Sequence, residues 1–323
     1  MNCGSAIERT EDGSRVQPIP PWAQTWWDGK LASGLALASL VRYSYDLKSM
    51  NIDLSKATVD EIRHRIAELS STYGTGTLRH IAITTKMILR ELDREKDAAK
   101  IPLPKHAEPR IVVYSPGDVE KILRGCDNLR DRLLIEVLVE TGARHGEMFH
   151  MKIKDVQFDE HSPILYLRGK TGVRTRRLFH AGPDLIAYLS LHPDRNNPEA
   201  KFWLGKGNKP LQYQGMYKIV QRLGRRALRR SIYPHGFRHT AATEDVKKFT
   251  DREMMIRFGW KRAEMVGVYA HLTGRDVDEK DLYLHGLNNR RCSACHSTVS
   301  LTAKFCENCG QTLVSTSGGE LHG

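Results

Sequence analysis

The chain has 323 residues, of which 40% are hydrophobic and 27% are charged, so it can form two compact domains with ordinary cores. It contains no run of about eighteen apolar residues, and its first residues lack the apolar stretch of a secretory signal, so we expect neither a membrane-spanning helix nor export. The formal net charge of +12 favours a polyanionic partner, usually nucleic acid, although a merely basic protein is the plainer alternative.

The first hundred residues predict a helical domain behind a tail. Residues 1–21 are polar, end in prolines and predict a flexible tail. Within residues 22–100, three segments carry apolar residues at helical spacing: 31–50, 58–74 and 76–96. The second begins with Thr58 and Glu61, a capping-box pair. The basic side chains of this domain could lie on duplex DNA, or they could simply solvate its outer face.

The next part of the chain predicts a linker and a second domain. Residues 101–110 hold three prolines and form the linker, and residues 111–288 form the domain. Two short strands are expected at 164–168 and 174–179, joined by a hairpin turn at 169–172. Helices are expected over 115–126, 129–141, 183–192, 214–230, 234–249, 251–259 and 262–272. The predicted fold class is therefore mainly α with a small antiparallel sheet (α+β), and the absence of a glycine-rich nucleotide loop predicts no nucleotide cofactor.

Three short segments of the second domain carry residues suited to phosphate chemistry. They are TGARHGE from Thr141 to Glu147, HGFRH from His235 to His239, and a Gly-Trp pair at 259–260 that is followed by Tyr269. Each segment alone arises by chance, and a lone tyrosine on an amphipathic helix usually belongs to the core. Arginine is planar, permanently charged and bidentate, so Arg144 and Arg238 together suit a phosphate under attack.

In this order the segments resemble the tyrosine recombinase (phage-type integrase) family, over about residues 25–285. The archaeal branch fits best, because the segment after Tyr269 continues as AHLTGRDVD. The resemblance implies a helical core-binding domain followed by a catalytic domain. It implies that Tyr269 attacks DNA to give a 3′-phosphotyrosine and a free 5′-hydroxyl, with no ATP and no catalytic metal.

The resemblance also assigns the remaining catalytic roles. Lys170, in the hairpin turn, is expected to be the general acid for the leaving 5′-oxygen, and its plainer reading is an exposed turn lysine. His235 is expected to bind the phosphate or assist proton movement. Trp260 stands where many members have histidine, so it can donate a hydrogen bond but cannot carry a proton.

Several nearby residues receive supporting roles. Glu147 is expected to brace the site, and His239 and His271 are expected to support it from the flanks. The strand arginines are expected to contact DNA phosphates. They are Arg174, Arg176 and Arg177.

The C-terminal part predicts a metal module. Cys292, Cys295, Cys306 and Cys309 form two Cys-x-x-Cys pairs, a spacing that suits four thiolates around structural Zn²⁺. Coincidence or a redox pair is the alternative. We expect a zinc ribbon over 289–312, a disordered tail over 313–323, and free thiols at the two other cysteines. Those are Cys3 and Cys126.

The predicted function is site-specific DNA recombination, or integration, in a mobile element or a chromosome-maintenance system. The family implies binding to an inverted-repeat site in double-stranded DNA, with four protomers on two duplexes, and hence a cytoplasmic, nucleoid-associated enzyme. Two alternatives stay open: a non-catalytic DNA-binding or transcription factor on the same fold, and a type IB topoisomerase.

Overall fold

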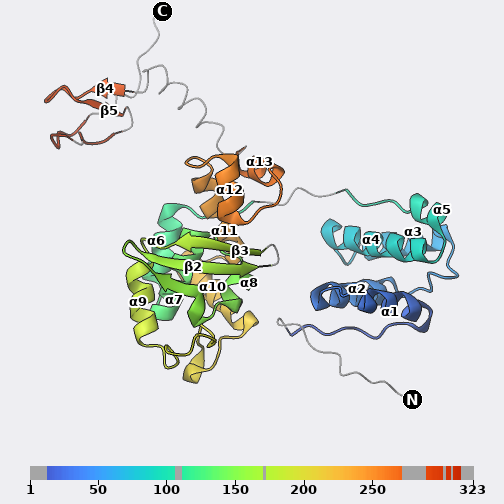
Figure 1. Ribbon diagram of the computed structural model, residues 1–323. Helices are drawn as coiled ribbons and strands as arrows, with labels where there is room; N and C mark the ends of the chain where they lie inside the picture. Colours follow the sequence, from blue (N-terminus) through green and yellow to red (C-terminus); the bar gives the residue numbers. More distant parts are fainter. Residues whose placement is uncertain are drawn as a thin grey trace, which may run out of the picture. The chain divides into compact units, whose positions relative to one another are not determined.

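The computed structural model describes residues 13–105, 111–169, 172–270, 289–300, 303–306 and 308–313. The chain divides into two compact units, Met1–Ile111 with Leu211–Met216, and Val112–Pro210 with Tyr217–Gly323. Both units are built mainly from helices (Figure 1). Among the described residues, no helix is both long and apolar enough to cross a membrane.

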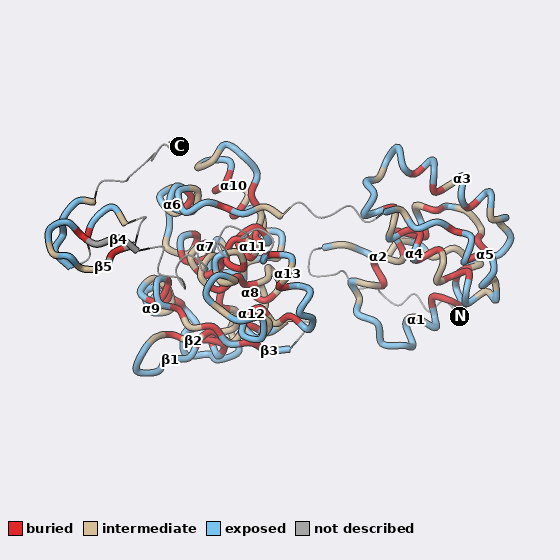
Figure 2. Tube along the Cα trace, turned by 90° about the horizontal axis from the view of Figure 1, so that it is seen from above, coloured by how far each residue is buried: buried red, intermediate tan, exposed pale blue. Residues whose placement is uncertain are grey.

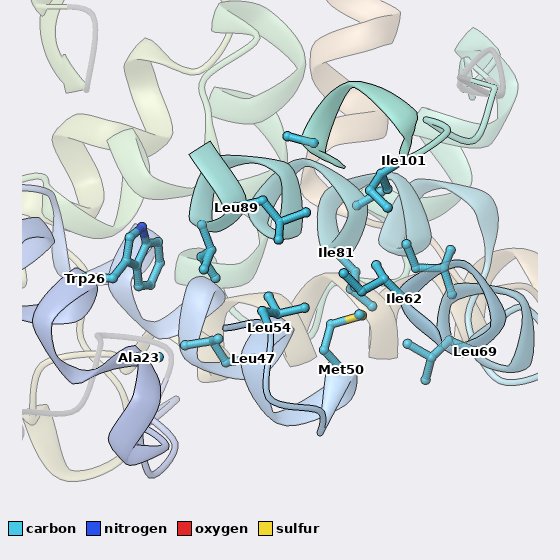
Figure 3. Close-up of a cluster of buried hydrophobic side chains, with 14 of the residues drawn as sticks. Ala23, Trp26, Leu47, Met50, Leu54, Ile62, Leu69, Ile81, Leu89 and Ile101 are labelled. Carbon is cyan, nitrogen blue, oxygen red and sulfur yellow. The ribbon is translucent and has the colours of Figure 1, made fainter. Parts of the chain in front are cut away.

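The first unit packs its helices around one apolar core. A short 3-10 turn, Pro21–Ala23, precedes α1 (Gln24–Ala32), α2 (Leu37–Met50), α3 (Val59–Leu69), α4 (Thr75–Glu91) and α5 (Glu95–Lys100). Leu54, Ile62, Ile81 and Leu89 are buried completely in this core (Figure 3). The capping box predicted at Thr58 and Glu61 is present at the start of α3.

The element boundaries in this unit differ from the predicted ones for local reasons. The single helix expected over 31–50 is interrupted, because Gly34 adopts a φ of 67° and the chain turns there. The helix α1 was not predicted at all, and its main anchors are the buried Trp26 and Trp27. The third helix ends at Glu91 rather than at residue 96, because Asp93 has a φ of 57°.

The second unit combines helices with one small sheet. The sheet is antiparallel in the order β1-β2-β3, from Val156–Phe158, Pro163–Gly169 and Gly172–Arg177. The helices are α6 (Pro116–Arg124), α7 (Leu129–Thr141), α8 (His145–His150), α9 (Gly182–Ser190), α10 (Tyr213–Leu228), α11 (Pro234–Asp245), α12 (Asp251–Phe258) and α13 (Glu264–Ala270). The predicted fold class, mainly α with a small antiparallel sheet, is confirmed.

The apolar helix α7 lies at the centre of this unit. Leu133, Leu134, Val137 and Leu138 are fully buried, and α7 packs against α6, α9 and α11. The buried stretches of these helices meet in the interior, and the exposed ones face outward (Figure 2). Beside the sheet, α8 packs on β2 and α12 packs on β3. Arg174 of β3 donates hydrogen bonds to the carbonyls of Thr141 and Arg257, so the ends of α7 and α12 meet at this strand.

A carboxylate pair on the α7–α9 contact predicts a pH-dependent stability. The guanidinium Nε of Arg132 lies 3.0 Å from Glu136 and 2.9 Å from Asp184. Burial, and then the charge of Asp184, raise the pKa of Glu136 to about 7. This group therefore stabilises the fold below its unfolded pKa, and the contribution is lost as the pH rises through about 7.

We expect Glu136→Gln to be more stable than the wild type by about 1–2 kcal/mol near pH 8, with the difference vanishing near pH 5. Urea unfolding at the two pH values measures this. The exposed Glu120, on α6, provides the control, since Glu120→Gln should shift stability by no more than about 0.5 kcal/mol at either pH. A Glu136→Gln variant that is less stable than the wild type at both pH values contradicts the prediction.

Candidate active site

The position of Arg144 is set by a glycine at the end of α7. Gly142 caps this helix with a φ of 57°, and a Cβ atom added there would lie 2.6 Å from Cε1 of Phe258. Only glycine permits both this backbone conformation and this close approach. The chain then reverses, and Arg144 becomes the N-cap residue of α8.

Glu147 lies between two arginines and is almost completely buried. Its carboxylate accepts hydrogen bonds from the backbone N–H of Arg144 at 2.8 Å, from Nη1 of Arg144 at 2.7 Å and from Nη2 of Arg174 at 2.8 Å. Burial alone would raise the pKa of Glu147, but Arg174 and Arg144 outweigh it and lower that pKa. The carboxylate is therefore ionised and holds the Arg144 side chain in place.

The C-terminal end of α12 gathers positive charge. Three arginine side chains donate hydrogen bonds to three successive backbone carbonyls there. The pairs are Arg174 with Arg257, Arg238 with Phe258 at 2.6 Å, and Arg144 with Gly259 at 3.4 Å. The partial negative charge of a helix C-terminus attracts cations, so this helix end organises the cluster. Glu147 is ion-paired with two of these three guanidinium groups, those of Arg144 and Arg174, so the cluster keeps an excess of positive charge suited to an anion.

Arg238, on α11, is the most deeply placed of these arginines. It is 2% exposed and also donates from Nη1 to the carbonyl of Gly142 at 2.9 Å. Burial, and then the charges of Arg144 and Arg174, lower the pKa of Arg238. Binding of an anion stabilises an arginine that lies close to other positive charges, because the anion offsets the repulsion between them.

Tyr269 is fixed on α13 by a stacked ring and a hydrogen bond. It is 2% exposed, and its ring stacks on Trp260 with 5.3 Å between centroids and 12° between planes. The phenolic oxygen lies 2.8 Å from Nδ1 of His239 on α11. Burial raises the pKa of Tyr269 and the charge of Arg238 lowers it in part. The Cζ atom of Arg238 lies 5.6 Å from the centroid of the Trp260 ring on which Tyr269 stacks. The helices α11, α12 and α13 that carry these groups pack on one another (Figure 1).

His235 completes the group in a neutral form. Its ring meets that of His239 edge to face, with 4.5 Å between centroids. Burial, and then the charges of His239, Arg238 and Arg144, lower the pKa of His235 to about 4. At neutral pH this imidazole can therefore donate one hydrogen bond and accept another.

The family model for the phage integrase family matches residues 113–275, half of the chain. The chain belongs to the phage integrase family. This match confirms the family predicted from the sequence. The fold agrees with the family, and so does the predicted enzyme class, a tyrosine recombinase that breaks and rejoins DNA.

Curated relatives of this family member are distant in sequence. Tyrosine recombinase XerA of Saccharolobus solfataricus is 21% identical over 257 residues, which cover 75% of this chain and 83% of the relative. Tyrosine recombinase XerD of Staphylococcus aureus is 24% identical over 195 residues, which cover 58% of this chain and 63% of the relative. The match to XerD therefore spans less than two thirds of that protein.

Solved structures share the fold. A lambda integrase dimer bound to a COC′ core site superposes with a TM-score of 0.64 at 20% identity, covering 77% of this chain and 75% of that one. The Tn1549 transposon integrase, in complex with transposon right end DNA, gives a TM-score of 0.65 at 14% identity and covers 82% and 99%. At these identities the likeness establishes the integrase fold.

The structure brings most of the predicted integrase site residues together. Arg144, His235, Arg238, Trp260 and Tyr269 lie around the C-terminal end of α12. The proposed acid Lys170 and the flanking His271 lie outside the described residues. The strand ends before and after residues 170–171, Gly169 and Gly172, form a register pair.

His239, which the sequence predicts to support the site from its flank, lies with its Nδ1 at the phenolic oxygen of Tyr269. The available signal was its spacing from His235, because residues four apart lie on the same face of a helix.

The prediction for the strand arginines is wrong for two of the three. Arg174 and Arg176 alternate on β3 with exposed residues and point into the unit, where both are buried. Arg174 pairs with Glu147, and Arg176 lies 3.4 Å from Asp245. These side chains hold the protein together and are not available to DNA, since a buried guanidinium requires its own partners.

A basic pocket of about 700 Å³ opens beside Arg144. Its charged lining includes Arg144, Glu147, Lys152, Lys154, Asp155, Arg168 and Lys201. Four of its cations are ion-paired with carboxylates: Arg144 with Glu147 at 2.7 Å, Arg168 with Asp155 at 2.7 Å, and both Lys152, at 2.8 Å, and Lys154 with Glu199. Lysines and arginines outnumber carboxylates in this lining, so the pocket places further positive charge next to Arg144.

Four cysteine sulfur atoms cluster near the short hairpin of β4 (Asn289–Arg291) and β5 (Thr298–Ser300). They belong to Cys292, Cys295, Cys306 and Cys309 and all lie within 4.8 Å of one another. The Sγ atoms of Cys292 and Cys309 are 3.6 Å apart, and those of Cys295 and Cys306 are 3.5 Å apart. A tetrahedral zinc with Zn–S bonds of about 2.3 Å requires S···S separations of about 3.8 Å. The donor set therefore fits one such ion.

Proposed function

We propose that this chain is a site-specific recombinase that cuts and rejoins DNA through a phosphotyrosine at Tyr269. The observation that carries the proposal is that buried Tyr269 and Arg238 both pack on Trp260, while Arg238 and Arg144 bind successive backbone carbonyls at the end of α12. A tyrosine with a purely structural role does not require two arginines nearby. A phosphate that is attacked by the tyrosine requires both arginines to neutralise its charge.

The proposed mechanism assigns one task to each side chain. Arg144 and Arg238 neutralise the non-bridging oxygens of the scissile phosphate, and neutral His235 hydrogen-bonds to one of them. The Tyr269 oxygen bonds to phosphorus while the bond from phosphorus to the 5′-oxygen breaks. Lys170 gives the leaving oxygen its proton. Trp260 orients the tyrosine ring by stacking, and its indole N–H can donate to the phosphate. The covalent intermediate keeps the bond energy, so rejoining needs neither ATP nor a catalytic metal.

We propose double-stranded DNA and further copies of this chain as the partners. The basic pocket beside Arg144 supports DNA binding, and a lambda integrase tetramer bound to a Holliday junction is among the solved structures of the same fold. An inverted-repeat site would recruit two protomers to each duplex, and two duplexes would bring four together. The enzyme would then work where the DNA is, in the cytoplasm.

Covalent capture tests the function. The protein is incubated with a pool of duplexes that carry a randomised segment and single-strand nicks, so that the cut fragment with the 5′-hydroxyl diffuses away and the adduct persists. DNA that resists removal by detergent is then sequenced. The proposal requires an adduct and a shared recovered sequence. A non-catalytic DNA-binding factor gives no adduct, and a type IB topoisomerase gives adducts without a shared site.

Because the pocket beside Arg144 is basic, we expect part of the affinity for DNA to be independent of the DNA sequence. We expect Lys201→Ala to weaken binding of unrelated duplexes about fivefold and to reduce the slope of log affinity against log salt by about 1, as the loss of one phosphate contact does. Filter binding over a salt series measures it. Lys121→Ala, at an exposed lysine of α6 outside the pocket, is the control. A loss confined to one DNA sequence contradicts a phosphate contact.

We further propose that the four clustered cysteines hold one structural Zn²⁺ and form a zinc ribbon. Native mass spectrometry should find one zinc per chain in the wild type and none in Cys309→Ser. Cys126→Ser, at a cysteine outside the cluster, should keep the metal. Four thiolates fill the tetrahedral shell of the zinc and leave no position for catalysis. Removal of the zinc by a chelator should therefore unfold the ribbon without slowing DNA cleavage by the purified protein. Retention of zinc in Cys309→Ser contradicts the proposed ligand set.

A further inference from the structure

His239 is the side chain that meets the reacting oxygen. It lies one turn beyond His235 on α11, and its Nδ1 is 2.8 Å from the phenolic oxygen of Tyr269. Within the described part of the chain, this is the hydrogen bond that reaches that oxygen. The phenol must lose a proton to attack phosphorus, and a general base must stand within hydrogen-bond reach of the proton it removes.

We propose that His239 is a catalytic residue and that its Nδ1 takes the phenolic proton as Tyr269 attacks DNA. The inference rests on the proposed recombinase function. The proton moves from the phenol to Nδ1, the bond from the phenolic oxygen to phosphorus forms, and the bond to the 5′-oxygen breaks. That oxygen leaves with a proton from the separate acid, Lys170. In the rejoining step each proton returns to its source, so His239 acts first as base and then as acid.

The surroundings favour this direction of transfer. Burial, and then the charge of Arg238, lower the pKa of His239, which favours the neutral ring, and in the tautomer with its proton on Nε2 the lone pair of Nδ1 accepts from the phenol. Burial raises the pKa of Tyr269, so the phenol does not ionise unaided. His235 and Arg238 flank His239 on its own helix, and Tyr269 faces it from α13. His235 contacts the ring of His239, and no hydrogen bond joins it to the phenol among the described residues.

The tyrosine ring is also prevented from leaving its partner. Trp260 stacks on one side of it, and Phe258 stacks behind Trp260 with 4.8 Å between centroids. This stacking restricts rotation of the Tyr269 side chain and keeps the phenolic oxygen next to Nδ1 of His239. Proton transfer and attack can then occur from one fixed geometry.

The test compares His239→Asn with the wild type on a suicide duplex carrying the captured site. The amide oxygen of asparagine can replace Nδ1 as a hydrogen-bond acceptor but cannot take a proton. We expect adduct formation near pH 7 to slow by about 10²-fold, with the deficit shrinking as the pH approaches the phenol's own range. The wild-type rate should fall at acidic pH as His239 becomes protonated, and the variant should lack that fall. His239→Gln is made in parallel, so that one variant carries the comparison if the other does not fold.

The matched control is His161→Asn, at an exposed turn before β2, which should leave the rate unchanged. Thermal unfolding and DNA binding are measured for each variant. An adduct rate equal to the wild type, or a deficit that is the same at every pH, overturns the role of His239 as base. Absence of any adduct with the wild-type protein is a different result, since it refutes the recombinase proposal itself.

Discussion

Replacing Tyr269 with phenylalanine should abolish the covalent protein–DNA adduct while leaving DNA binding unchanged. The phenyl ring keeps its stacking on Trp260 and loses only the oxygen that bonds to His239. Loss of that hydrogen bond costs about 1 kcal/mol of stability, far too little to unfold the unit. Loss of the nucleophile should reduce adduct formation by at least about 10⁴-fold, because no other group replaces it. Denaturing electrophoresis of the nicked-duplex reaction measures the adduct, and a gel-shift assay measures binding.

The control for this experiment is Tyr166→Phe, at a half-buried tyrosine of β2, which should form adduct at the wild-type rate. Peptide mapping of the wild-type adduct should find the DNA on Tyr269. An adduct of normal yield from Tyr269→Phe, or one mapped to a different tyrosine, contradicts the assigned nucleophile.

The second large effect is expected at Glu147. In Glu147→Gln the shape of the side chain is kept, but the carboxylate that serves Arg144 and Arg174 is lost. Arg174 is then left buried with no opposing charge, and breaking a buried pair in this way costs about 3–5 kcal/mol. Arg144 also loses the partner that positions it, so adduct formation should fall together with stability. Chemical denaturation and the adduct assay, both run at low temperature where the variant is still folded, separate the two effects.

The pH dependence of the stability loss in Glu147→Gln distinguishes a lost ion pair from a packing defect. Because the pKa of Glu147 is lowered in the folded protein, its contribution is present above the unfolded pKa and is lost as the pH falls through the folded pKa. The stability difference between the wild type and Glu147→Gln should therefore be full at neutral pH and should narrow in acid. The control is Glu160→Gln, at an exposed glutamate, where a change within about 0.5 kcal/mol is expected. A difference that does not vary with pH would indicate packing alone.

The sequence predicted the elements whose signals are local. The capping box at Thr58 marks the start of α3, and the apolar run of α7 marks the centre of the second unit. The strand β1 escaped prediction because it has three residues and only Val156 among them is buried. The helix α8 escaped because it is a six-residue element whose start depends on the capping pair of Arg144 and Glu147.

The site was predicted as a set of residues rather than as a geometry. The order of its segments indicated which side chains meet, and the structure places five of the six proposed catalytic residues in one cluster, with Lys170 outside the described part. No local pattern could show that the carbonyls at the end of α12 hold three arginines, or that Arg174 points inward. Those facts depend on how β3 and α12 pack, and the contact of His239 with Tyr269 depends on how α11 and α13 cross.

The buried setting of Tyr269 has a consequence for how an assembly of these proteins would work. The phenol is packed into its own polypeptide, against Trp260 and His239 and within the influence of Arg238. Each protomer would thus bring its own tyrosine to its own histidine and arginine, and would not borrow the tyrosine from a neighbour. Cooperation among protomers would then govern the order in which strands are cut, by controlling when each tyrosine is uncovered.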